Sequence, residues 1–269
     1  MAITFGSLFT GIGGLDLGLE QVGMQCRWQV EINPYCTKVL EKHWPDIRRY
    51  TDVREIEDLE VVDLICGGFP CQPVSVAGLR RGTEDKRWLW PEFHRIIRMV
   101  RPRYIIVENV TGLLSANKGS AMGGILMDLA ESGYDAQWDR VSAESVGAPH
   151  LRWRIFIYGA IRSQSTDGKG SRAVGNGQAM ADTEFDRRQG IGEDRKATGS
   201  PRLCHGTRAD QEPSIFGGGW WPIEPNVGRV AHGIPSRMDR LRALGGAVLP
   251  QVAEFVGEKI MEWEKNGIK

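Results

Sequence analysis

The chain has 269 residues, of which 41% are hydrophobic and 25% are charged, which is enough to bury the core of one large domain with a small appendage. Its 34 basic and 34 acidic residues give a net charge of zero, so bulk charge does not by itself indicate a nucleic-acid partner. Every uncharged apolar run is far shorter than the ~20 residues of a spanning helix, and no signal peptide is recognisable. A membrane or secreted protein is therefore not expected.

The cysteines are odd in number and none belongs to a C-x-x-C pair, which argues against a disulfide framework and against structural zinc. We therefore expect reduced thiols, a cytoplasmic location and no metal site. The five are Cys26, Cys36, Cys66, Cys71 and Cys204.

Strand-like and helix-like segments alternate along the first 160 residues. Strand patterns cover 3–9, 26–31, 61–66, 103–108 and 154–159, and helical periodicity covers 14–22, 33–43, 91–100 and 119–132. This alternation predicts a mostly parallel sheet covered by helices on both faces. We therefore assign 1–160 to one α/β domain.

The composition changes after Ala160. Residues 161–219 are rich in Gly, Ser, Arg, Asp and Gln, a composition that is also typical of a disordered linker. However, Trp220-Trp221-Pro222 follows, and paired tryptophans need a surface to pack against. We therefore interpret 161–234 as a small, loop-rich domain and 235–269 as a helical return to the first domain.

Three predicted strand ends carry residues suited to catalysis or ligand binding: FTGIGG (9–14), GGFPCQPVS (67–75) and ENV (108–110). The carboxyl ends of parallel strands meet at one edge of a sheet, where open α/β folds bind ligands. An isolated cysteine such as Cys71 more often packs in a core than reacts. Its position after a strand that ends in Gly-Gly, beside the other two motifs, instead favours a nucleophilic thiol at this edge.

These motifs stand in a longer ordered set: FTGIGG, Glu31, Asp52, GGFPCQ, ENV, Arg152-x-Arg154 and GGAVLPQ (245–251). Over nearly the whole chain this set resembles the DNA cytosine 5-methyltransferase family, in particular its short phage, prophage and restriction-linked members. The resemblance implies a Rossmann-like, S-adenosylmethionine-dependent catalytic domain in 1–160 and a target-recognition domain in 161–234. It also implies methyl transfer to carbon 5 of a flipped cytosine in DNA.

The expected cofactor site has residue types that fit any nucleotide, and only the resemblance selects S-adenosylmethionine. Gly11, Gly13 and Gly14 allow a sharp turn between a strand and a helix. Glu31 is placed to accept hydrogen bonds from ribose hydroxyls, and the resemblance assigns the adenine amino group to Asp52. The full expected set is Phe9, Gly11, Gly13, Gly14, Glu31, Asp52, Val53, Pro70, Gly246 and Val248.

Carbon 5 of cytosine becomes nucleophilic when a thiolate adds to carbon 6, which divides a hard substitution into two easier steps. The resemblance assigns that thiolate to Cys71. It assigns to Glu108 the binding of cytosine N3 and the amino group, with a proton supplied as the thiol attacks. It further implies that Arg154 orients Glu108, and that Arg152 supports the thiol region or the DNA. By residue type alone, Glu108 is equally explained as a strand-end carboxylate paired with an arginine.

A cytosine cannot react inside a stacked duplex, so the base must be flipped out at a cost of a few kcal/mol. Residues 80–87, RRGTEDKR, carry four basic and two acidic side chains, a net of +2 that could neutralise phosphates or simply be solvated. We expect the Cys71 loop to close over the flipped base. The expected DNA contacts are Gln72, Ser75, Arg80, Arg81 and Arg87.

Two positions depart from the family pattern. His150 stands where the family usually has glutamine, and we expect altered support of the catalytic loop rather than loss of activity. Gly246 stands where the family usually has asparagine. Either water fills the space of the missing side chain, or the larger pocket admits a donor that carries more than a methyl group, such as carboxy-S-adenosylmethionine.

The principal hypothesis is a monomeric DNA cytosine 5-methyltransferase that acts on double-stranded DNA, either with a cognate restriction endonuclease or for a phage. The same mechanism on RNA and a non-catalytic DNA-binding relative are the alternatives. The joint presence of Cys71, Glu108 and Arg154 argues against the non-catalytic relative. The target sequence is not predicted, because no general code connects side chains in 161–234 to bases.

Overall fold

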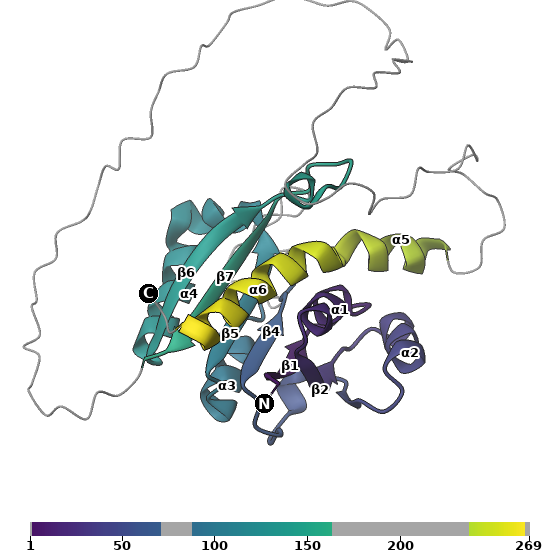
Figure 1. The fold of residues 1–269 in the computed structure, drawn as a ribbon, viewed down its shortest axis with the longest axis horizontal. Helices are drawn as coiled ribbons and strands as arrows, with labels where there is room; N and C mark the ends of the chain where they lie inside the picture. The colour runs from purple at the N-terminus through teal and green to yellow at the C-terminus, as the bar shows by residue number, and fades with distance from the viewer. Residues whose placement is uncertain (1, 71–87, 163–236, 267–269) are drawn as a thin grey trace, which may run out of the picture. The chain divides into compact units, whose positions relative to one another are not determined.

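The computed structural model describes residues 2–70, 88–162 and 237–266, which belong to one compact unit (Figure 1). The predicted small domain at 161–234, apart from its first two residues, lies outside the described residues. Within the described ranges, no helix combines the length and the apolar character that a membrane crossing requires.

A seven-stranded sheet forms the centre of the part of the chain that the structure describes. Its strands are β1 (Thr4–Leu8), β2 (Gln25–Val30), β3 (Arg48–Tyr50), β4 (Leu64–Gly67), β5 (Tyr104–Val110), β6 (Tyr134–Val141) and β7 (Arg154–Ile161). Their order across the sheet is β3-β2-β1-β4-β5-β7-β6. The five neighbouring strands β3, β2, β1, β4 and β5 are parallel, whereas β7 runs antiparallel to both β5 and β6.

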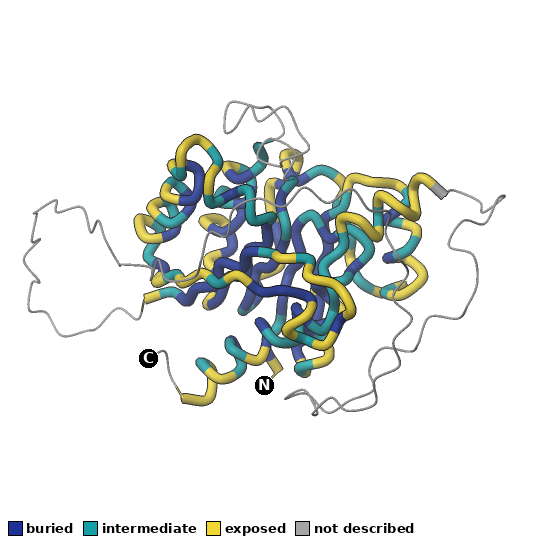
Figure 2. The backbone as a smooth tube through the Cα atoms, turned by 90° about the horizontal axis from the view of Figure 1, so that it is seen from above, coloured by how far each residue is buried: buried dark blue, intermediate teal, exposed yellow. Residues whose placement is uncertain are grey.

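Helices cover both faces of the sheet, with α1 and α6 on one face and α3 and α4 on the other (Figure 1). The helices are α1 (Gly14–Gln21), α2 (Pro34–His43), α3 (Trp90–Val100), α4 (Ser120–Glu131), α5 (Arg237–Gly246) and α6 (Pro250–Asn266). Each face has its own buried apolar cluster, and the buried residues follow the strands through the middle of the molecule (Figure 2). The predicted fold class is therefore confirmed.

Local sequence explains the elements that surround the site. The run YIIVENV forms β5, a central strand buried on both faces, for which an uninterrupted apolar run is typical. Helix α2 begins after Asn33, whose side chain accepts hydrogen bonds from the backbone N–H groups of Tyr35 and Cys36, with Pro34 in the first turn. Helix α3 also begins with a proline near its start and buries an apolar stripe that includes Phe93.

All nine predicted strands and helices are present, and the largest difference at a boundary lies at β4, which begins at Leu64 rather than at residue 61. Two strands were not predicted. Strand β3 has only three residues, too few for a period to be recognised. Strand β6 is an edge strand with many exposed polar side chains, so it lacks the apolar run that identified the central strands.

The chain leaves β1 toward β2 and β3 and then returns to β4 on the other side of β1. Such a reversal of strand order leaves a crevice at the carboxyl ends of the two central strands, where α/β proteins bind ligands. Because β7 is antiparallel to β5, the first residue of β7 lies at this same edge: Arg154 pairs with Val110, the last residue of β5. The sequence pattern did not predict this reversal of direction.

Candidate active site

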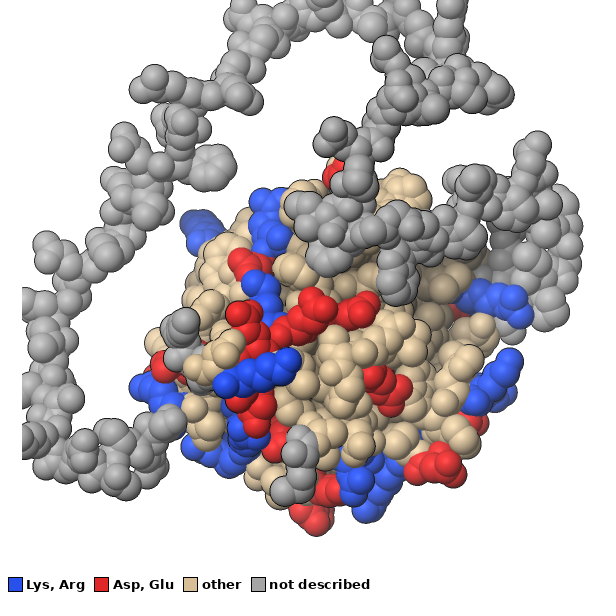
Figure 3. Space-filling model, in the orientation of Figure 1, with Lys and Arg blue, Asp and Glu red and all other residues tan. Residues whose placement is uncertain are grey.

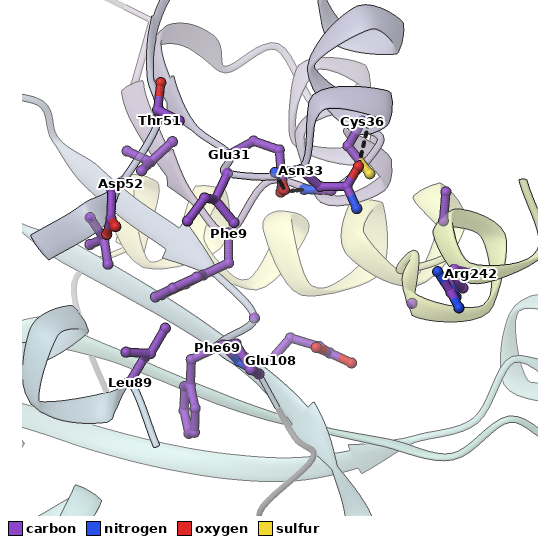
Figure 4. Close-up of a pocket in the computed structure, with 18 of the residues that line it drawn as sticks. Phe9, Glu31, Asn33, Cys36, Thr51, Asp52, Phe69, Leu89, Glu108 and Arg242 are labelled. Atoms are coloured by element: carbon purple, nitrogen blue, oxygen red, sulfur yellow. Dashed lines mark hydrogen bonds between the residues drawn. The ribbon is translucent and has the colours of Figure 1, made fainter. Parts of the chain in front are cut away.

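A cavity of about 380 Å³ lies at the carboxyl ends of the parallel strands (Figure 4). This volume is typical of small-molecule sites. A smaller recess beside it is lined by Gly14 and Val248. Of the expected cofactor and catalytic residues, the main cavity brings together Phe9, Gly11, Glu31, Asp52, Val53, Pro70, Glu108, Arg154 and Gly246.

The FTGIGG segment turns between β1 and α1 through left-handed backbone conformations. Gly11 and Gly13 have φ values of 60° and 83°, which a glycine adopts without strain, whereas Phe9 has a φ of 53°, which a residue with a Cβ rarely adopts. The last two glycines also serve packing. A Cβ on Gly13 would lie 2.4 Å from the ring of Trp44, and a Cβ on Gly14 would lie 2.1 Å from the carbonyl oxygen of Val248. Gly13 therefore supports the loop from outside the cavity, while Gly11 lines the cavity.

Backbone N–H groups hold both carboxylate oxygens of Glu31. The N–H of Gly11 donates to Oε2 at 2.7 Å and the N–H of Asn33 donates to Oε1 at 2.7 Å, and Figure 4 shows Glu31 beside Asn33 at the cavity wall. Each oxygen keeps a lone pair that can accept another hydrogen bond. Glu31 is therefore held in place as an acceptor for hydroxyl groups, as a ribose requires.

Asp52 lies toward the other side of the cavity from Arg242 in Figure 4. Its carboxylate accepts hydrogen bonds from the backbone N–H of Arg54 at 3.0 Å and from the Nε of Arg54 at 2.9 Å. These bonds hold the pKa of Asp52 below its usual range, so the group remains an ionised acceptor at neutral pH. The aromatic ring of Phe9 and the buried side chain of Val53 lie nearby. A hydrogen-bond acceptor beside apolar side chains fits an adenosine.

The buried carboxyl group of Glu108 pairs with Arg154 across β5 and β7. The Nε of Arg154 lies 2.9 Å from Oε1 of Glu108, and both residues line the cavity. Room for this carboxyl group depends on Gly68, because a Cβ there would lie 2.5 Å from Oε2 of Glu108. The second glycine of the GGFPCQ motif thus serves the glutamate of the ENV motif.

Burial raises the pKa of Glu108 to about 7, and the charges of Arg154 and Arg152 oppose this rise. Near neutrality the carboxyl group can therefore either donate or accept a proton. The pairing with arginine that residue type alone suggested is present. However, Glu108 is only 8% exposed and lines a cavity. These features are typical of a functional acid rather than of a surface ion pair.

The chain that leads to Cys71 is anchored by Asn109. Its Nδ2 donates to the carbonyl oxygen of Phe69 at 3.3 Å, and the ring of Phe69 packs edge to face against Trp88, with ring centroids 5.1 Å apart. The aromatic contact therefore joins two described residues on either side of the 71–87 segment. Cys71 itself and the expected DNA contacts Gln72, Ser75, Arg80, Arg81 and Arg87 lie outside the described residues.

Arg152 contacts the turn that contains Gly246. Its Nη2 donates to the carbonyl oxygens of Gly245 at 2.8 Å and Ala247 at 2.6 Å. The Nε of Arg152 is buried without a hydrogen-bond partner among the described residues. His150 is exposed and makes no hydrogen bond within the described part of the chain.

The sequence analysis missed several residues that line the cavity. Asn33 carried a recognisable signal, because Asn-Pro at the start of a predicted helix is typical of an N-cap. Cys36 is a buried thiol whose pKa burial raises to about 11, so it is protonated and packs. No local signal identifies Arg242, because only the placement of α5 brings it to the cavity. The missed residues include Asn33, Cys36, Thr51, Leu89 and Arg242.

Basic and acidic side chains are intermixed on the face shown in Figure 3. This agrees with the zero net charge of the sequence. Attraction to a polyanion must therefore come from local groups rather than from a field of one sign.

Comparisons with known proteins agree with this geometry. A family model described as C-5 cytosine-specific DNA methylase matches residues 3–193. The chain is 28% identical over 295 residues to the type II methyltransferase M2.BsuMI of Bacillus subtilis, which covers 95% of this chain and 75% of that protein. It is 36% identical over 159 residues to M.HgiCII of Herpetosiphon aurantiacus, covering 58% and 36%. It is 35% identical over 178 residues to M.NgoBV of Neisseria gonorrhoeae, covering 60% and 42%. The chain thus spans less than half the length of the last two.

Solved structures share the fold. A prophage-encoded Escherichia coli protein described as a DNA modification methyltransferase superposes with a TM-score of 0.51 at 24% identity, covering 60% of this chain and 47% of that chain. The methyltransferase EhMeth of Entamoeba histolytica gives a TM-score of 0.50 at 17% identity, covering 61% and 54%. Since the family model spans well over half of the sequence, the chain belongs to the C-5 cytosine-specific DNA methylases, which transfer a methyl group from S-adenosylmethionine to cytosine in DNA.

Proposed function

We propose that this chain methylates carbon 5 of cytosine in double-stranded DNA through a covalent Cys71 adduct, with Glu108 as the group that protonates the base. The observation that carries the proposal is the Glu108–Arg154 pair, which lies in the same cavity as the Glu31 and Asp52 carboxylates. An acid for the base and acceptors for a nucleoside cofactor are thus within one site.

Glu108 has the properties that an acid for N3 of cytosine needs. A pKa of about 7 leaves a substantial protonated fraction at neutral pH, and a protonated carboxyl offers one donor and one acceptor. That pair matches the N3 acceptor and the amino donor of cytosine. Proton donation to N3 as the thiolate adds to carbon 6 prevents a build-up of negative charge on the ring.

Arg154 orients that acid. Its Nε bond to Oε1 fixes one carboxyl oxygen, so Oε2, beside Gly68, would carry the proton for N3, while the second lone pair of Oε1 would accept from the amino group of the base. Its Nη1 donates to the carbonyl oxygen of Trp153 at 2.9 Å, which limits rotation of the guanidinium group. Donors on the same planar group can also reach the carbonyl oxygen of the base.

S-adenosylmethionine supplies the methyl group when bound. The carboxylates of Glu31 and Asp52 would accept from the ribose hydroxyls and the adenine amino group, and Phe9 and Val53 would contact the adenine faces. Because the nucleoside and the base would bind in one cavity, the methyl donor and the activated carbon 5 of cytosine would be held close together. This orientation lowers the barrier to methyl transfer. After the transfer, loss of the carbon 5 proton to water and elimination of Cys71 would release the product.

We further propose a cytoplasmic, monomeric enzyme that acts beside a cognate restriction endonuclease. The names of the relatives support the endonuclease partner, since M2.BsuMI, M.HgiCII and M.NgoBV are all type II methyltransferases. Co-purification and genomic neighbourhood would test the partner, and the mass of the purified protein in solution would test the oligomeric state.

The decisive experiment incubates purified protein with S-adenosylmethionine and mixed-sequence double-stranded DNA, followed by digestion and mass analysis of the nucleosides. We expect 5-methylcytosine with the wild type and none with Cys71→Ser. A covalent complex should also form on DNA that contains 5-fluorocytosine. Product on RNA but not on DNA, or tight DNA binding without product, would contradict the proposal.

A donor with an additional carboxylate is a second candidate, favoured by two observations. A Cβ on Gly246 would meet no atom of the described residues within 4 Å, so these residues leave the wall of the cavity open there. Arg242 lines the same cavity, and its side chain makes no ion pair or hydrogen bond with another described residue. Competition between S-adenosylmethionine and carboxy-S-adenosylmethionine in the wild type and in Gly246→Asn tests this candidate. An unchanged preference for the methyl donor in both proteins would contradict it.

A further inference from the structure

The turn between α5 and α6 is held from two sides. On one side, the Nη2 of Arg152 donates to the carbonyl oxygens of Gly245 and Ala247. On the other side, the carbonyl oxygen of Val248 occupies the place that a Cβ on Gly14 would take. The turn is therefore fixed between the segment that precedes β7 and the start of α1.

The same turn forms a wall of the site beside the glycine loop, and Gly11, Gly14 and Glu108 line the recess together with it. Gly245 and Gly246 line the main cavity, and Gly246 and Val248 line the recess beside it. The helix that follows the turn is also closely packed, because the carbonyl oxygen of Pro250 lies where a Cβ on Gly18 would be. A change in the position of the turn would therefore change the shape of the cofactor site.

Arg152 is adapted to holding this turn. Its backbone has a φ of 27°, in the left-handed region that a residue with a Cβ rarely adopts, and such conformations persist when the surrounding structure enforces them. Arg152 makes no ion pair with a carboxylate among the described residues. Its two hydrogen bonds to backbone carbonyl oxygens are charge-assisted. Each replaces a hydrogen bond that the carbonyl oxygen would otherwise make to water.

We propose that Arg152 is a positioning residue for the cofactor, which holds the 245–247 turn against the glycine loop, rather than a group that acts on the thiol or the DNA. The inference rests on the proposed function, since it requires that the cavity binds S-adenosylmethionine. Arg154, two residues later, holds Glu108. The segment 152–154 would thus set the cofactor end and the base end of the site together.

The chemistry of the contact defines informative variants. One nitrogen, Nη2, donates to both carbonyl oxygens, and the single ammonium of lysine has enough donors to do the same. Methionine keeps most of the side-chain length without a donor. Arg101 provides a matched control, because it also has a left-handed φ, of 54°, and its Nη1 donates to the carbonyl oxygen of Ser132 at 2.6 Å, outside the cavity.

The test measures binding of S-adenosylhomocysteine by titration calorimetry, together with KM for S-adenosylmethionine and kcat at saturating donor. For Arg152→Met we expect Kd and KM to rise about tenfold or more, from the loss of two charge-assisted hydrogen bonds, with kcat changed less than about threefold. Arg152→Lys should restore Kd to within about threefold of the wild type, and Arg101→Met should leave all three values unchanged.

Several outcomes would overturn the inference. An unchanged Kd in Arg152→Met, or a loss of kcat with an unchanged Kd, would assign Arg152 to the thiol or the DNA instead. Thermal unfolding shows whether Arg152→Met is folded. If it is not folded, Arg152→Lys tests the inference instead. A normal Kd with a reduced kcat in Arg152→Lys would refute the inference. Failure of the wild type to bind S-adenosylhomocysteine would refute the proposed function itself, which separates the two failures.

Discussion

Two regions of the molecule each contain a buried carboxyl group, and the two groups meet different surroundings. Asp16, in the first turn of α1, is 0% exposed. It accepts hydrogen bonds from the hydroxyl group of Ser7 at 2.6 Å and from the Nε2 of Gln29 at 2.8 Å. Gln29 in turn accepts from Arg49 at 3.0 Å. This region is a closed polar network beneath the glycine loop.

Glu108 is buried to a similar degree but faces the cavity and pairs with a cation. Burial raises the pKa of both groups, of Asp16 to about 6 and of Glu108 to about 7. A raised pKa therefore does not by itself identify a catalytic acid. Access to a cavity and a cationic partner distinguish Glu108, whereas the neutral partners of Asp16 indicate a structural role.

The largest expected difference between the two regions is catalytic. Glu108→Gln should lower kcat by roughly 10²- to 10⁴-fold, because the amide cannot supply a proton to the base. Asp16→Asn should change kcat only a few-fold, since Ser7 can reverse its hydrogen bond to accept from the new amide. Single-turnover methylation of duplex DNA measures both, and equal losses in the two variants would remove the distinction.

The two groups also make separable contributions to the dependence of stability on pH. A group whose pKa is raised by folding favours the folded state most below its unfolded pKa, and this stability is lost as pH rises through the folded pKa. The contribution of Asp16 to the free energy of unfolding should therefore fall as the pH rises from about 4 to about 6. The contribution of Glu108 should fall as the pH rises from about 4.5 to about 7. Each contribution amounts to about 3 kcal/mol.

Urea unfolding at a series of pH values tests this expectation. Asp16→Asn should remove the decline that ends near pH 6, and Glu108→Gln the decline that continues to about pH 7. An unchanged slope in either variant would show that the carboxyl group it removes does not carry a raised pKa in the folded protein.

Arg154→Gln tests how far the base end depends on its cation. The variant should lower kcat by about 10²-fold, because Glu108 loses the partner that orients it. Loss of the positive charge should also raise the pKa of Glu108 further, so the decrease in kcat at alkaline pH should move to higher pH. A pH–rate profile with an unshifted alkaline limb would contradict the pairing as a control of this pKa.

The smallest expected effect is that of Gly246→Asn on stability. Its new side chain would meet no described residue at the Cβ position, so the free energy of unfolding should change by no more than about 0.5 kcal/mol. Gly14→Ala is the matched comparison, because its Cβ would lie 2.1 Å from a backbone oxygen and should destabilise by more than about 1 kcal/mol. Thermal unfolding of the two variants, side by side, measures the difference. Equal destabilisation would show that the wall at Gly246 is closed.

Much of the site was predictable from sequence because its motifs lie at strand ends. The alternation of apolar segments located five strands, and the carboxyl edge of a parallel sheet then brought Phe9, Glu31 and Glu108 together. Gly13 shows the limit of this reasoning. It was predicted in the cofactor site, yet it packs against Trp44 and lines neither the cavity nor the recess. The motif identifies the loop but not which of its glycines faces the ligand.

The sequence by itself determined the alternating elements, the turn residues and the carboxylates, because periodicity and backbone preference act over a few residues. Only the tertiary structure decided the direction of β7, which brings Arg154 to Glu108. It also decided the contact of Arg152 with Gly245, 93 residues away, and the raised pKa of Glu108. These depend on strand register and burial, which arise when distant segments pack together and which no local pattern records.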